Sequence, residues 1–511
     1  LWVYQNEINL IKGLENGYNN GSTFEDESHS YLSDLDIFGK ASLFALLNRC
    51  STKNGISLLA EKLISSNTEE TINLRQTAVK ELATKIDDTF DFRAILKGND
   101  VNNIELLKEK LNYKLAKQLK FTHKSILRFY IKLLPFFMPI VIFAAVILGS
   151  KFWGILSIFI LIHAALTFYW MKQINEVYHG FGGSSTLLAD YADAIKWTED
   201  RDWKSEYVKG LFSSHDKVSQ QIKKLAKIIQ AFDARLNLLV GGVLNFTLLW
   251  DLRCCVKLDE WHKSSSIKVE NGLDRIGYFE ELISVATLAY NEPNWVFPQI
   301  NDGFSLSATE MGHPLIPAKK RVNNNFKVEV KPTVDIVTGS NMAGKSTFLR
   351  TLGINMILAY AGAPVCADHM ELSIFKILTY MRIKDSLNES TSTFKAELNR
   401  LKMILEKVGE HKNSLVLIDE MLRGTNSRDK FLGSKVFIEK LINVGTPTLF
   451  ATHDLQLSEL KETNKQTVRN FHFDIQIKKG EMEFDYKIKD GPCETFNAAI
   501  LLKEIGLSID N

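Results

Sequence analysis

The chain has 511 residues, which is enough for two to four domains that each bury a core of their own. Its formal net charge of +2 is close to neutral, so net charge alone argues for no nucleic-acid partner. The five cysteines form no C-x-x-C pair, a spacing that argues against a zinc site and is typical of reduced thiols in the cytosol.

The first stretch of the chain, to about Lys132, is predicted to be helical. Ser42–Asn48 and Ile56–Ile64 carry apolar residues at helical spacing, and helices rich in Glu and Lys follow them. No pattern in this stretch indicates a catalytic site. We interpret residues 1–132 as the first half of an all-α domain.

Two uncharged runs come next, Leu133–Gly149 and Phe152–Met171. Each run approaches the about 20 residues that a helix needs to cross the hydrocarbon core of a bilayer. Basic residues precede the pair and Lys172 follows it, which agrees with the positive-inside rule. The pattern favours a transmembrane helical hairpin with both ends in the cytoplasm. A hairpin buried in a soluble protein and a hydrophobic dimer contact are the alternatives. His163 in the second run is either a functional polar group or, as we favour, a histidine satisfied by its neighbours.

The chain between the hairpin and about Asn301 is again helical. Lys217–Phe232 is amphipathic with a basic face, which could contact DNA phosphates or anionic lipid, although a solvated helix face is the simpler interpretation. The helix around Arg275–Tyr290 is predicted to stop at Asn291-Glu292-Pro293. Beyond this stop, β-rich runs alternate with helices, which is the signature of a parallel α/β sheet.

The strongest motif follows a strand predicted at Val334–Thr338. It spells G-x-x-x-x-G-K-S from Gly339 to Ser346, and a helix predicted at Thr347–Tyr360 comes directly after it. The two glycines let the backbone turn its N–H groups toward phosphates, and the helix N-terminus adds its positive end. Lys345 would place a cation between the β and γ phosphates of a nucleotide, and the Ser346 hydroxyl would bind Mg²⁺. A chance match in a loop is the alternative, and the flanking strand and helix argue against it. The nucleotide-binding residues predicted here are Gly339, Ser340, Asn341, Met342, Ala343, Gly344, Lys345, Ser346 and Thr347.

Two further strands end in residues suited to the hydrolysis of ATP. The apolar strand Ser414–Ile418 leads into Asp419 and Glu420. Asp419 is predicted to lie in the magnesium shell, and Glu420 to polarise the attacking water as general base. The strand Pro447–Ala451 leads into His453, which is predicted to hydrogen-bond the γ-phosphate or the water, with a structural histidine as the alternative. These residues predict ATP and Mg²⁺ as cofactors and ATP hydrolysis as the reaction, with Lys345 taking part.

Ser392 opens a helix that is predicted to run toward Leu405. The simple interpretation is that its side chain caps the helix N-terminus. The sharper interpretation is that this helix N-terminus faces a γ-phosphate, which could be one bound to another subunit.

The motifs of residues 305–511 resemble those of the MutS family of mismatch-repair ATPases. The loop GSNMAGKST resembles the family's G-x-N-M-x-G-K-S-T, and DEMLRGTNSRD at Asp419–Asp429 resembles its D-E-x-x-R-G-T. The segments HPLI, STF and TH match as well, and Phe471–Leu502 resembles the family's closing strands and helix. Upstream, Asp34–Leu63 and Leu258–Tyr290 look like the two ends of the family's helical lever.

The resemblance implies a homodimer with composite ATP sites, in which Ser392 of one subunit reaches the ATP of the other. It also implies that ATP closes the ATPase halves and moves the levers. A side chain should pack on the adenine from just before the P-loop strand, and Val322 is the candidate. Ser390 and Thr391 stand where the family often has Gly-Arg, a departure that bears on the contact between subunits. Counterparts of the family's mismatch-reading and connector domains are not expected in this chain.

The sequence thus predicts an α/β P-loop NTPase domain of the ABC type, with a parallel-rich sheet, at residues 302–511. Residues 1–132 and 172–301 form an all-α lever/core domain, and residues 133–171 form an apolar, transmembrane helical hairpin inserted where the family has its DNA clamp. Two functions remain open: an ATPase of the mismatch-repair type that binds double-stranded DNA, and a membrane-tethered ATPase switch with its ATPase domain on the cytoplasmic side. The near absence of Lys and Arg at the hairpin tip favours the second. A transporter is disfavoured, because two spans leave few groups to line a pathway.

Overall fold

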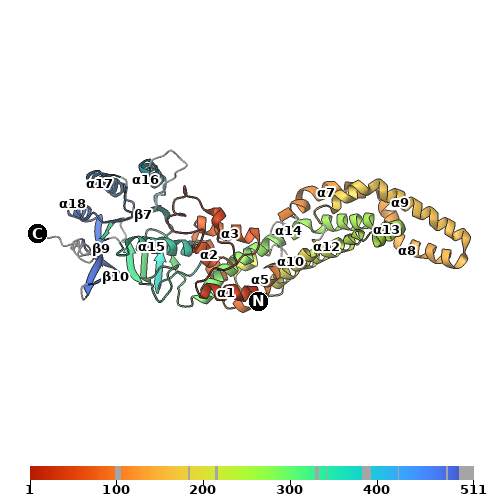
Figure 1. Ribbon diagram of the computed structural model, residues 1–511, viewed down its shortest axis with the longest axis horizontal. Helices are drawn as coiled ribbons and strands as arrows, with labels where there is room; N and C mark the ends of the chain where they lie inside the picture. The colour runs from red at the N-terminus through yellow and green to blue at the C-terminus, as the bar shows by residue number, and fades with distance from the viewer. Residues whose placement is uncertain are drawn as a thin grey trace.

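The chain folds into an α-helical part and an α/β part, which lie at opposite ends of an elongated molecule (Figure 1). The computed structural model describes residues 1–97, 105–106, 108–181, 184–212, 217–328, 333–340, 342–381, 393–423, 425–478 and 481–493. A helical hairpin forms the end of the molecule that lies farthest from the sheets (Figure 1).

The helical part is assembled from helices of very different length. Several begin at a Ser, Thr or Asn whose side chain accepts a backbone N–H, as Thr52 and Thr68 do for α3 and α4. The elements are α1 Trp2–Ile11, η1 Ser22–Phe24, α2 Leu43–Leu47, α3 Lys53–Ile64, α4 Glu69–Ala83, η2 Ile86–Asp88, α5 Thr89–Lys97, η3 Lys110–Lys114, α7 Leu115–Gln118, η4 Leu119–His123, α8 Ser125–Leu148, α9 Ser150–Tyr178, α10 Ser185–Glu199, α11 Glu206–Gly210, α12 Val218–Asp233, η5 Ala234–Leu236, α13 Leu238–Leu248 and α14 Trp250–Asn291.

The α/β part follows α14 in the chain. Its elements are β1 Gln299–Ile300, β2 Leu306–Met311, β3 Asn324–Val328, β4 Val334–Gly339, α15 Lys345–Tyr360, β5 His369–Leu372, β6 Lys376–Tyr380, α16 Thr393–Glu410, β7 Ser414–Asp419, α17 Ser427–Val444, β8 Thr448–Thr452, η6 Leu455–Glu459, α18 Leu460–Thr463, β9 Val468–Lys478 and β10 Glu481–Asp490.

One helix, α14, connects the two ends of the molecule. It has 42 residues, so it is about 63 Å long at 1.5 Å per residue. It packs on α3 and α4 near the sheets and on α12 farther out. The predicted stop is confirmed, because α14 ends at Asn291, two residues before Pro293. The helix is therefore a continuous rod between the hairpin end and the α/β part.

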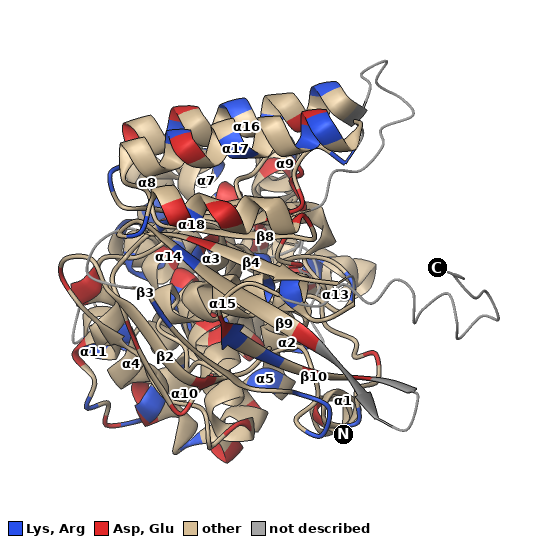
Figure 2. Cartoon of the chain, turned by 90° about the vertical axis from the view of Figure 1, so that its left-hand side faces the viewer, with Lys and Arg blue, Asp and Glu red and all other residues tan. Residues whose placement is uncertain are grey.

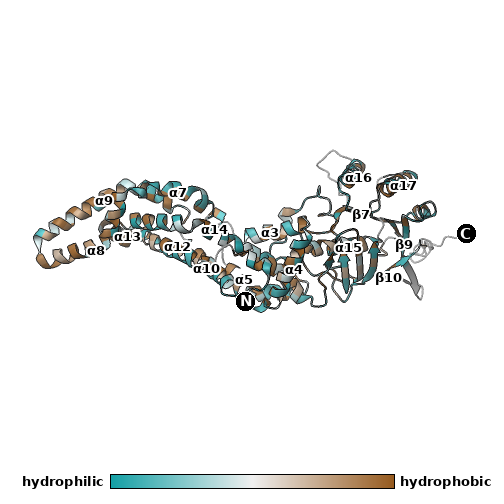
Figure 3. Ribbon diagram, turned by 180° about the vertical axis from the view of Figure 1, so that it is seen from behind, coloured by the Kyte–Doolittle hydropathy of each residue, from teal (hydrophilic) through white to brown (hydrophobic). Residues whose placement is uncertain are grey.

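The hairpin predicted from the two uncharged runs is formed by α8 and α9. The start of α8 and the end of α9 both extend beyond those runs. Most residues of both helices are hydrophobic (Figure 3), and many of their large apolar side chains are exposed. By length and composition, these two helices could each cross a membrane, and a third span is possible if the bent pair α13 and α14 is counted as one. The hairpin's place in a membrane stays a prediction.

The larger sheet has the strand order β10-β9-β4-β8-β7-β6. All neighbouring strands in it are parallel except the β9–β10 pair, so the parallel-rich sheet predicted for this part is confirmed. A smaller sheet has the order β1-β5-β2-β3. The order of the larger sheet puts β8 between the P-loop strand β4 and the acid-bearing strand β7.

Both faces of the larger sheet are buried, as is usual for parallel strands. Leu415 and Leu417 of β7 belong to a core that continues through α15 into the helical part. Val416 and Ile418 point the other way, into a second core with residues of α16 and α17. The P-loop helix α15 therefore lies between the sheet and the helical part, where it can transmit a movement of one to the other.

Candidate functional site

The predicted chemical residues meet because three parallel strands end at one edge of the sheet. Thr338 of β4 pairs with Thr452 of β8, and Asp419 of β7 pairs with Ala451 of β8. The residues that follow these strands are the P-loop, His453 and Glu420. Sheet register alone thus brings together three segments that are far apart in the sequence.

The P-loop has the backbone that its glycines predict. Gly339 and Gly344 have φ of 146° and 111°, in the region that side chains disfavour. A Cβ on Gly339 would also lie 2.7 Å from the carbonyl oxygen of Phe473. Met342 takes a positive φ of 73° and is 84% exposed, so this loop residue points its side chain to solvent. The described residues of the loop therefore have the glycine-dependent backbone that is typical of loops that bind anions.

Lys345 is buried beneath this loop. Its Nζ donates to the carbonyl oxygens of Gly339, at 2.7 Å, and of Ser340, at 2.8 Å. Burial lowers the pKa of the Lys345 ammonium, and the nearby carboxylates of Glu420 and Asp419 oppose that shift. A buried cation that hydrogen-bonds neutral carbonyl groups is suited to receive an anion such as a phosphate.

Asp419 and Ser346 form the pair expected for magnesium. Asp419 is 6% exposed, and burial raises the pKa of its carboxyl although the Ser346 hydroxyl donates a hydrogen bond to it. Carboxylate and hydroxyl oxygens are ligands that Mg²⁺ accepts. Within the residues that the structure describes, no three or more His, Cys, Asp or Glu side chains cluster as metal ligands. Ser346 and Asp419 would therefore hold Mg²⁺ together with phosphate and water oxygens, as is usual for this ion.

Glu420 and His453 form a hydrogen-bonded pair. His453 Nδ1 lies 3.0 Å from Glu420 Oε1, and Lys430 Nζ lies 3.5 Å from His453 Nε2. Burial acts to raise the pKa of Glu420, but the hydrogen bond and charge of His453, with Lys430 and Lys345, outweigh it and hold this pKa below its usual value. An ionised carboxylate only accepts, so Nδ1 of His453 carries the proton in this pair. Glu420 is thus ionised and held in place beside the P-loop.

Most of the predicted residues line one cavity of about 350 Å³. It is lined by Ser340, Met342, Gly344, Lys345, Ser346, Thr347, Asp419, Glu420, Arg423 and Tyr486. Ala343 is buried behind the loop, and His453 contacts the site through Glu420. Asn341 and Ser392 lie outside the described residues. Val322 lies just before β3 and is not among the residues lining this cavity, so its contact with adenine stays a prediction.

Two lining residues, Arg423 and Tyr486, were not singled out in the sequence. Arg423 Nη2 donates to the backbone oxygen of Asp419, at 3.0 Å, and its Nε lies 3.8 Å from Glu420 Oε2. The sequence signal for it was its place in the segment after Asp419. Tyr486 reaches the loop because the β9–β10 pairing is irregular between Phe484 and Ile488 and gives Tyr486 a φ of 52°. Nothing in the local sequence marks that irregularity.

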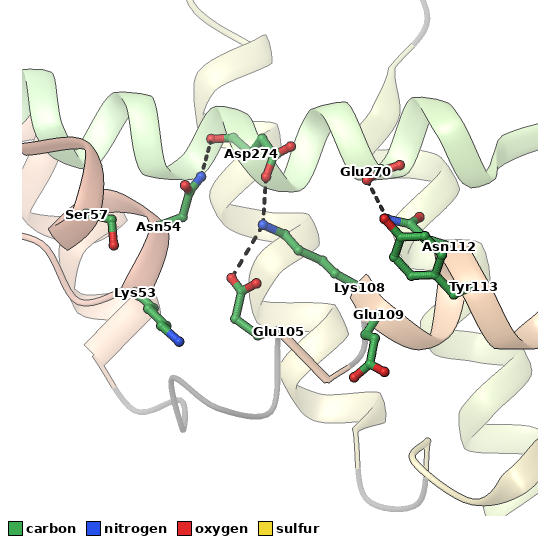
Figure 4. Close-up of a pocket in the computed structure, with 10 residues that line it drawn as sticks. All are labelled: Lys53, Asn54, Ser57, Glu105, Lys108, Glu109, Asn112, Tyr113, Glu270 and Asp274. Atoms are coloured by element: carbon green, nitrogen blue, oxygen red, sulfur yellow. Dashed lines mark hydrogen bonds and ion pairs between the residues drawn. The ribbon is translucent and has the colours of Figure 1, made fainter. Parts of the chain in front are cut away.

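A second pocket, of about 410 Å³, lies on the helical part, beside α3 and α14 (Figure 4). Its charged groups are largely paired: Lys108 Nζ lies 2.6 Å from Asp274 Oδ1 and 3.5 Å from Glu105 Oε1. The Asn112 amide donates to Glu270 in the same pocket. The pocket shares no lining residue with the P-loop cavity.

Comparison with known proteins agrees with this geometry. Residues 335–502 match the family model described as MutS domain V. A protein from Streptococcus pyogenes serotype M1, described as DNA mismatch repair protein MutS, is 29% identical over 268 residues, which are 51% of this chain and 31% of that protein. A protein of the same description from Aquifex pyrophilus is 34% identical over 229 residues, 44% of this chain and 26% of that protein. The chain therefore covers less than a third of the length of these relatives.

Proposed function

We propose that this chain, whose ATPase domain belongs to the MutS family, binds ATP with Mg²⁺ and hydrolyses it to move a helical lever. The observation that carries the proposal is the cavity in which Lys345, the Ser346–Asp419 pair and the Glu420–His453 pair converge. A lysine, an acid beside a hydroxyl, and an acid paired with a histidine are the kinds of group that phosphoryl transfer to water uses.

The residues divide the work as follows. Lys345 would exchange its two carbonyl partners for the β- and γ-phosphate oxygens, which neutralises charge that develops during transfer. Bound Mg²⁺ supplies electrostatic stabilisation of the phosphates, and Ser346 and Asp419 hold it. Glu420, ionised and oriented by His453, accepts the proton of the attacking water. Arg423 keeps the turn after β7 in place through the Asp419 carbonyl.

A homodimer with composite sites is part of the proposal. Large apolar side chains are exposed on the P-loop, on α16 and on α17, and exposed apolar surface is unfavourable where it forms a patch that no other surface covers. They include Met342 at 84%, Phe394 at 41%, Leu432 at 47% and Val436 at 65% exposed. A second copy on this face would cover them and would bring its Ser392 segment toward the nucleotide. ATP could then act as the link that closes the dimer.

The lever would act at a membrane through the α8–α9 hairpin. In the most apolar 18-residue windows of these helices, only 28% and 17% of the residues are buried. The helices have 24 and 29 residues, about 36 and 44 Å, against a hydrocarbon core of about 30 Å. α8 also contains Pro135 and Pro139, which cost about 3 kcal/mol each inside a soluble helix but are common in membrane helices. Water is a poor solvent for such a surface, and a bilayer is a good one.

DNA binding is the second candidate, because the relatives are described as DNA mismatch repair proteins. The surface offers less support for it. At the ATPase end, basic and acidic residues are interspersed along α16 and α17 (Figure 2). The hairpin, at the place where a DNA clamp is expected, exposes apolar residues such as Phe136, Ile140 and Phe143. We therefore favour the membrane-tethered switch.

The ATPase proposal is tested with two site variants and one control. Lys345→Ala should lose ATP binding, measured with a fluorescent ATP analogue. Glu420→Gln should bind ATP like the parent and release phosphate about 10²- to 10⁴-fold more slowly. Lys402→Ala removes an exposed lysine of α16 and should change neither quantity. Parent-like hydrolysis by the Glu420 variant would refute the general-base role.

The choice between membrane and DNA is tested by fractionation and by titration. The intact chain should stay with membranes after alkaline carbonate extraction, and a form without residues 133–171 should be released. Double-stranded DNA should bind only weakly at both 50 and 200 mM salt to the intact protein in detergent. Tight binding that weakens steeply with salt would favour the DNA candidate instead. A chain recovered wholly in the soluble fraction without detergent would refute the membrane tether.

A further inference from the structure

A third apolar helix, α13, lies beside the hairpin, and no charged residue occurs between Arg235 and Asp251 around it. Its side chains are strongly exposed: Leu238 is 86%, Leu239 80% and Val243 64% exposed. Full burial of a leucine or valine side chain is worth about 1.5–3 kcal/mol. An exposed row of this kind on an 11-residue helix indicates an apolar environment around it.

The polar side chains of α13 and its N-cap are all bonded to nearby backbone. Asn237 accepts from the N–H of Val240 at 3.1 Å. Asn245 donates to the carbonyl of Gly241 at 3.0 Å and accepts from the N–H of Asp251 at 2.9 Å. The Thr247 hydroxyl donates to the carbonyl of Val243 at 2.7 Å. Each of these side chains thus makes at least one hydrogen bond within the protein, which lowers the cost of placing it in hydrocarbon.

A hydrogen bond attaches α13 to the hairpin at a point well inside α9. The Phe246 carbonyl lies 2.8 Å from Nδ1 of His163, which is buried and also contacts the Tyr130 hydroxyl. His163 lies nine residues before Lys172, about 13 Å along α9 from the charged base of the hairpin. A cleft of about 450 Å³ separates α8 from α13 and is lined mainly by apolar side chains, among them Met138, Ile142 and Leu248. A cleft of this kind is suited to an acyl chain.

The chain then turns back. Leu249 has a φ of 50°, and α14 leaves at 76° to α13. The Asp251 carboxylate is paired with Arg235 at 3.4 Å, and Arg235 also donates to Asn175 in the last turn of α9, after Lys172. With 11 residues, about 16 Å, α13 is too short to cross a hydrocarbon core of about 30 Å. In a bilayer, a helix of this length that enters and leaves at the same surface would have both ends on one side of the membrane.

We propose that α13 is a re-entrant membrane helix, embedded among the acyl chains of the cytoplasmic leaflet beside α8 and α9. The inference rests on the proposed membrane tether and deepens it. Because α13 continues into α14, the rod that reaches the ATPase domain is itself anchored in the leaflet. A movement of the lever then pulls on the bilayer through α13 and not only through the hairpin. The exposed lysines at the hairpin base, Lys124 and Lys172, suit the anionic headgroups of that leaflet.

The test uses single cysteines labelled with an environment-sensitive fluorophore in the full chain reconstituted into liposomes. Val243→Cys reports on α13, Phe143→Cys on the hairpin, and Lys223→Cys on the exposed face of α12. The five native cysteines are buried, and the chain without an added cysteine measures their background. Quenching is measured with lipids brominated along the acyl chain and with aqueous iodide.

Probes at 143 and 243 should both be quenched by brominated lipid, at least twofold more than the probe at 223, which iodide should quench. A probe at 243 quenched by iodide, while that at 143 is quenched by lipid, would overturn the re-entrant helix and leave the tether intact. A probe at 243 shielded from both quenchers would place protein on α13 and would also overturn the inference. If the probe at 143 is quenched by iodide alone, the tether itself fails.

Discussion

The joint between the lever and the ATPase domain contains a buried ion pair whose removal should be costly. Arg75 of α4 is 0% and Glu281 of α14 is 1% exposed in their side chains. The Arg75 guanidinium donates to Glu281 Oε2 at 2.9 Å and Oε1 at 2.5 Å. Its Nε donates to the carbonyl of Ala361 at 2.8 Å, directly after the P-loop helix α15. The Arg75 side chain therefore links α4 to α14 and to the end of the P-loop helix α15.

Arg75→Met should destabilise the protein by about 4–6 kcal/mol. Loss of one partner of a buried pair costs about 3–5 kcal/mol, because the Glu281 carboxylate stays buried without its countercharge. The Ala361 carbonyl loses its donor at a further cost of about 1 kcal/mol or more. The double variant Arg75→Met/Glu281→Met removes both charges and should recover most of the loss. Domains are stable by only about 5–15 kcal/mol, so the single variant should unfold far more easily.

The assay is thermal unfolding of the intact chain in detergent, followed by tryptophan fluorescence. Midpoints are compared because a chain of several domains need not unfold in two states. The single variant should lose about 8 °C or more, and the double variant about 4 °C or less. Lys53→Met, an exposed change on α3, should leave the midpoint almost unchanged. A single variant within 2 °C of the parent, or a double variant as unstable as the single one, would contradict the reasoning.

Three further predictions concern the nucleotide site and the lever. Tyr486→Ala should raise the KM for ATP about twofold to tenfold with little change in kcat, because an aromatic contact in the cavity is worth about 0.5–1.5 kcal/mol. A change in kcat with an unchanged KM would contradict this expectation. His453→Ala should lower kcat and move the acid limb of its pH profile upward, because the pKa of Glu420 is held down in part by His453; steady-state rates from pH 5 to 8 measure both. Burial raises the pKa of Glu280 to about 7, against the hydrogen bonds from Thr52 and Ser51, whereas its usual value is 4.5. Because the folded protein binds this proton more tightly than the unfolded chain, the free energy of unfolding should fall by about 3 kcal/mol as pH rises from 4.5 to 7 and stay level above pH 7. Glu280→Gln carries no such charge, so the difference in unfolding midpoint between this variant and the parent should shift in favour of the variant from pH 5 to pH 8.

The cavity that we propose as the nucleotide site could be anticipated from the sequence because its parts are local. A P-loop needs its glycines, its lysine and its serine within a few residues, between a strand and a helix, and β4 and α15 supply that context. Asp419, Glu420 and His453 could be predicted because each follows a strand whose end must lie at the same sheet edge. The hairpin could be predicted because the absence of charge over two runs is visible without any tertiary contact. For Ser392 and Val322, the roles predicted from the family resemblance remain untested.

Other features were decided only by the tertiary structure. Arg75 and Glu281 are separated by 206 positions, and no local pattern shows that two ordinary charged residues will be buried against each other. Tyr486 reaches the nucleotide cavity through an irregularity in strand pairing, and Arg423 becomes a lining residue through the turn after β7. α13 is too short to cross a membrane by itself, and the proposal that it is re-entrant depends on its contact with His163 and on the bend into α14. Chemistry carried by short motifs is encoded locally. The burial of side chains, the pairing of charges and the place of α13 beside the hairpin depend on how distant segments of the chain meet.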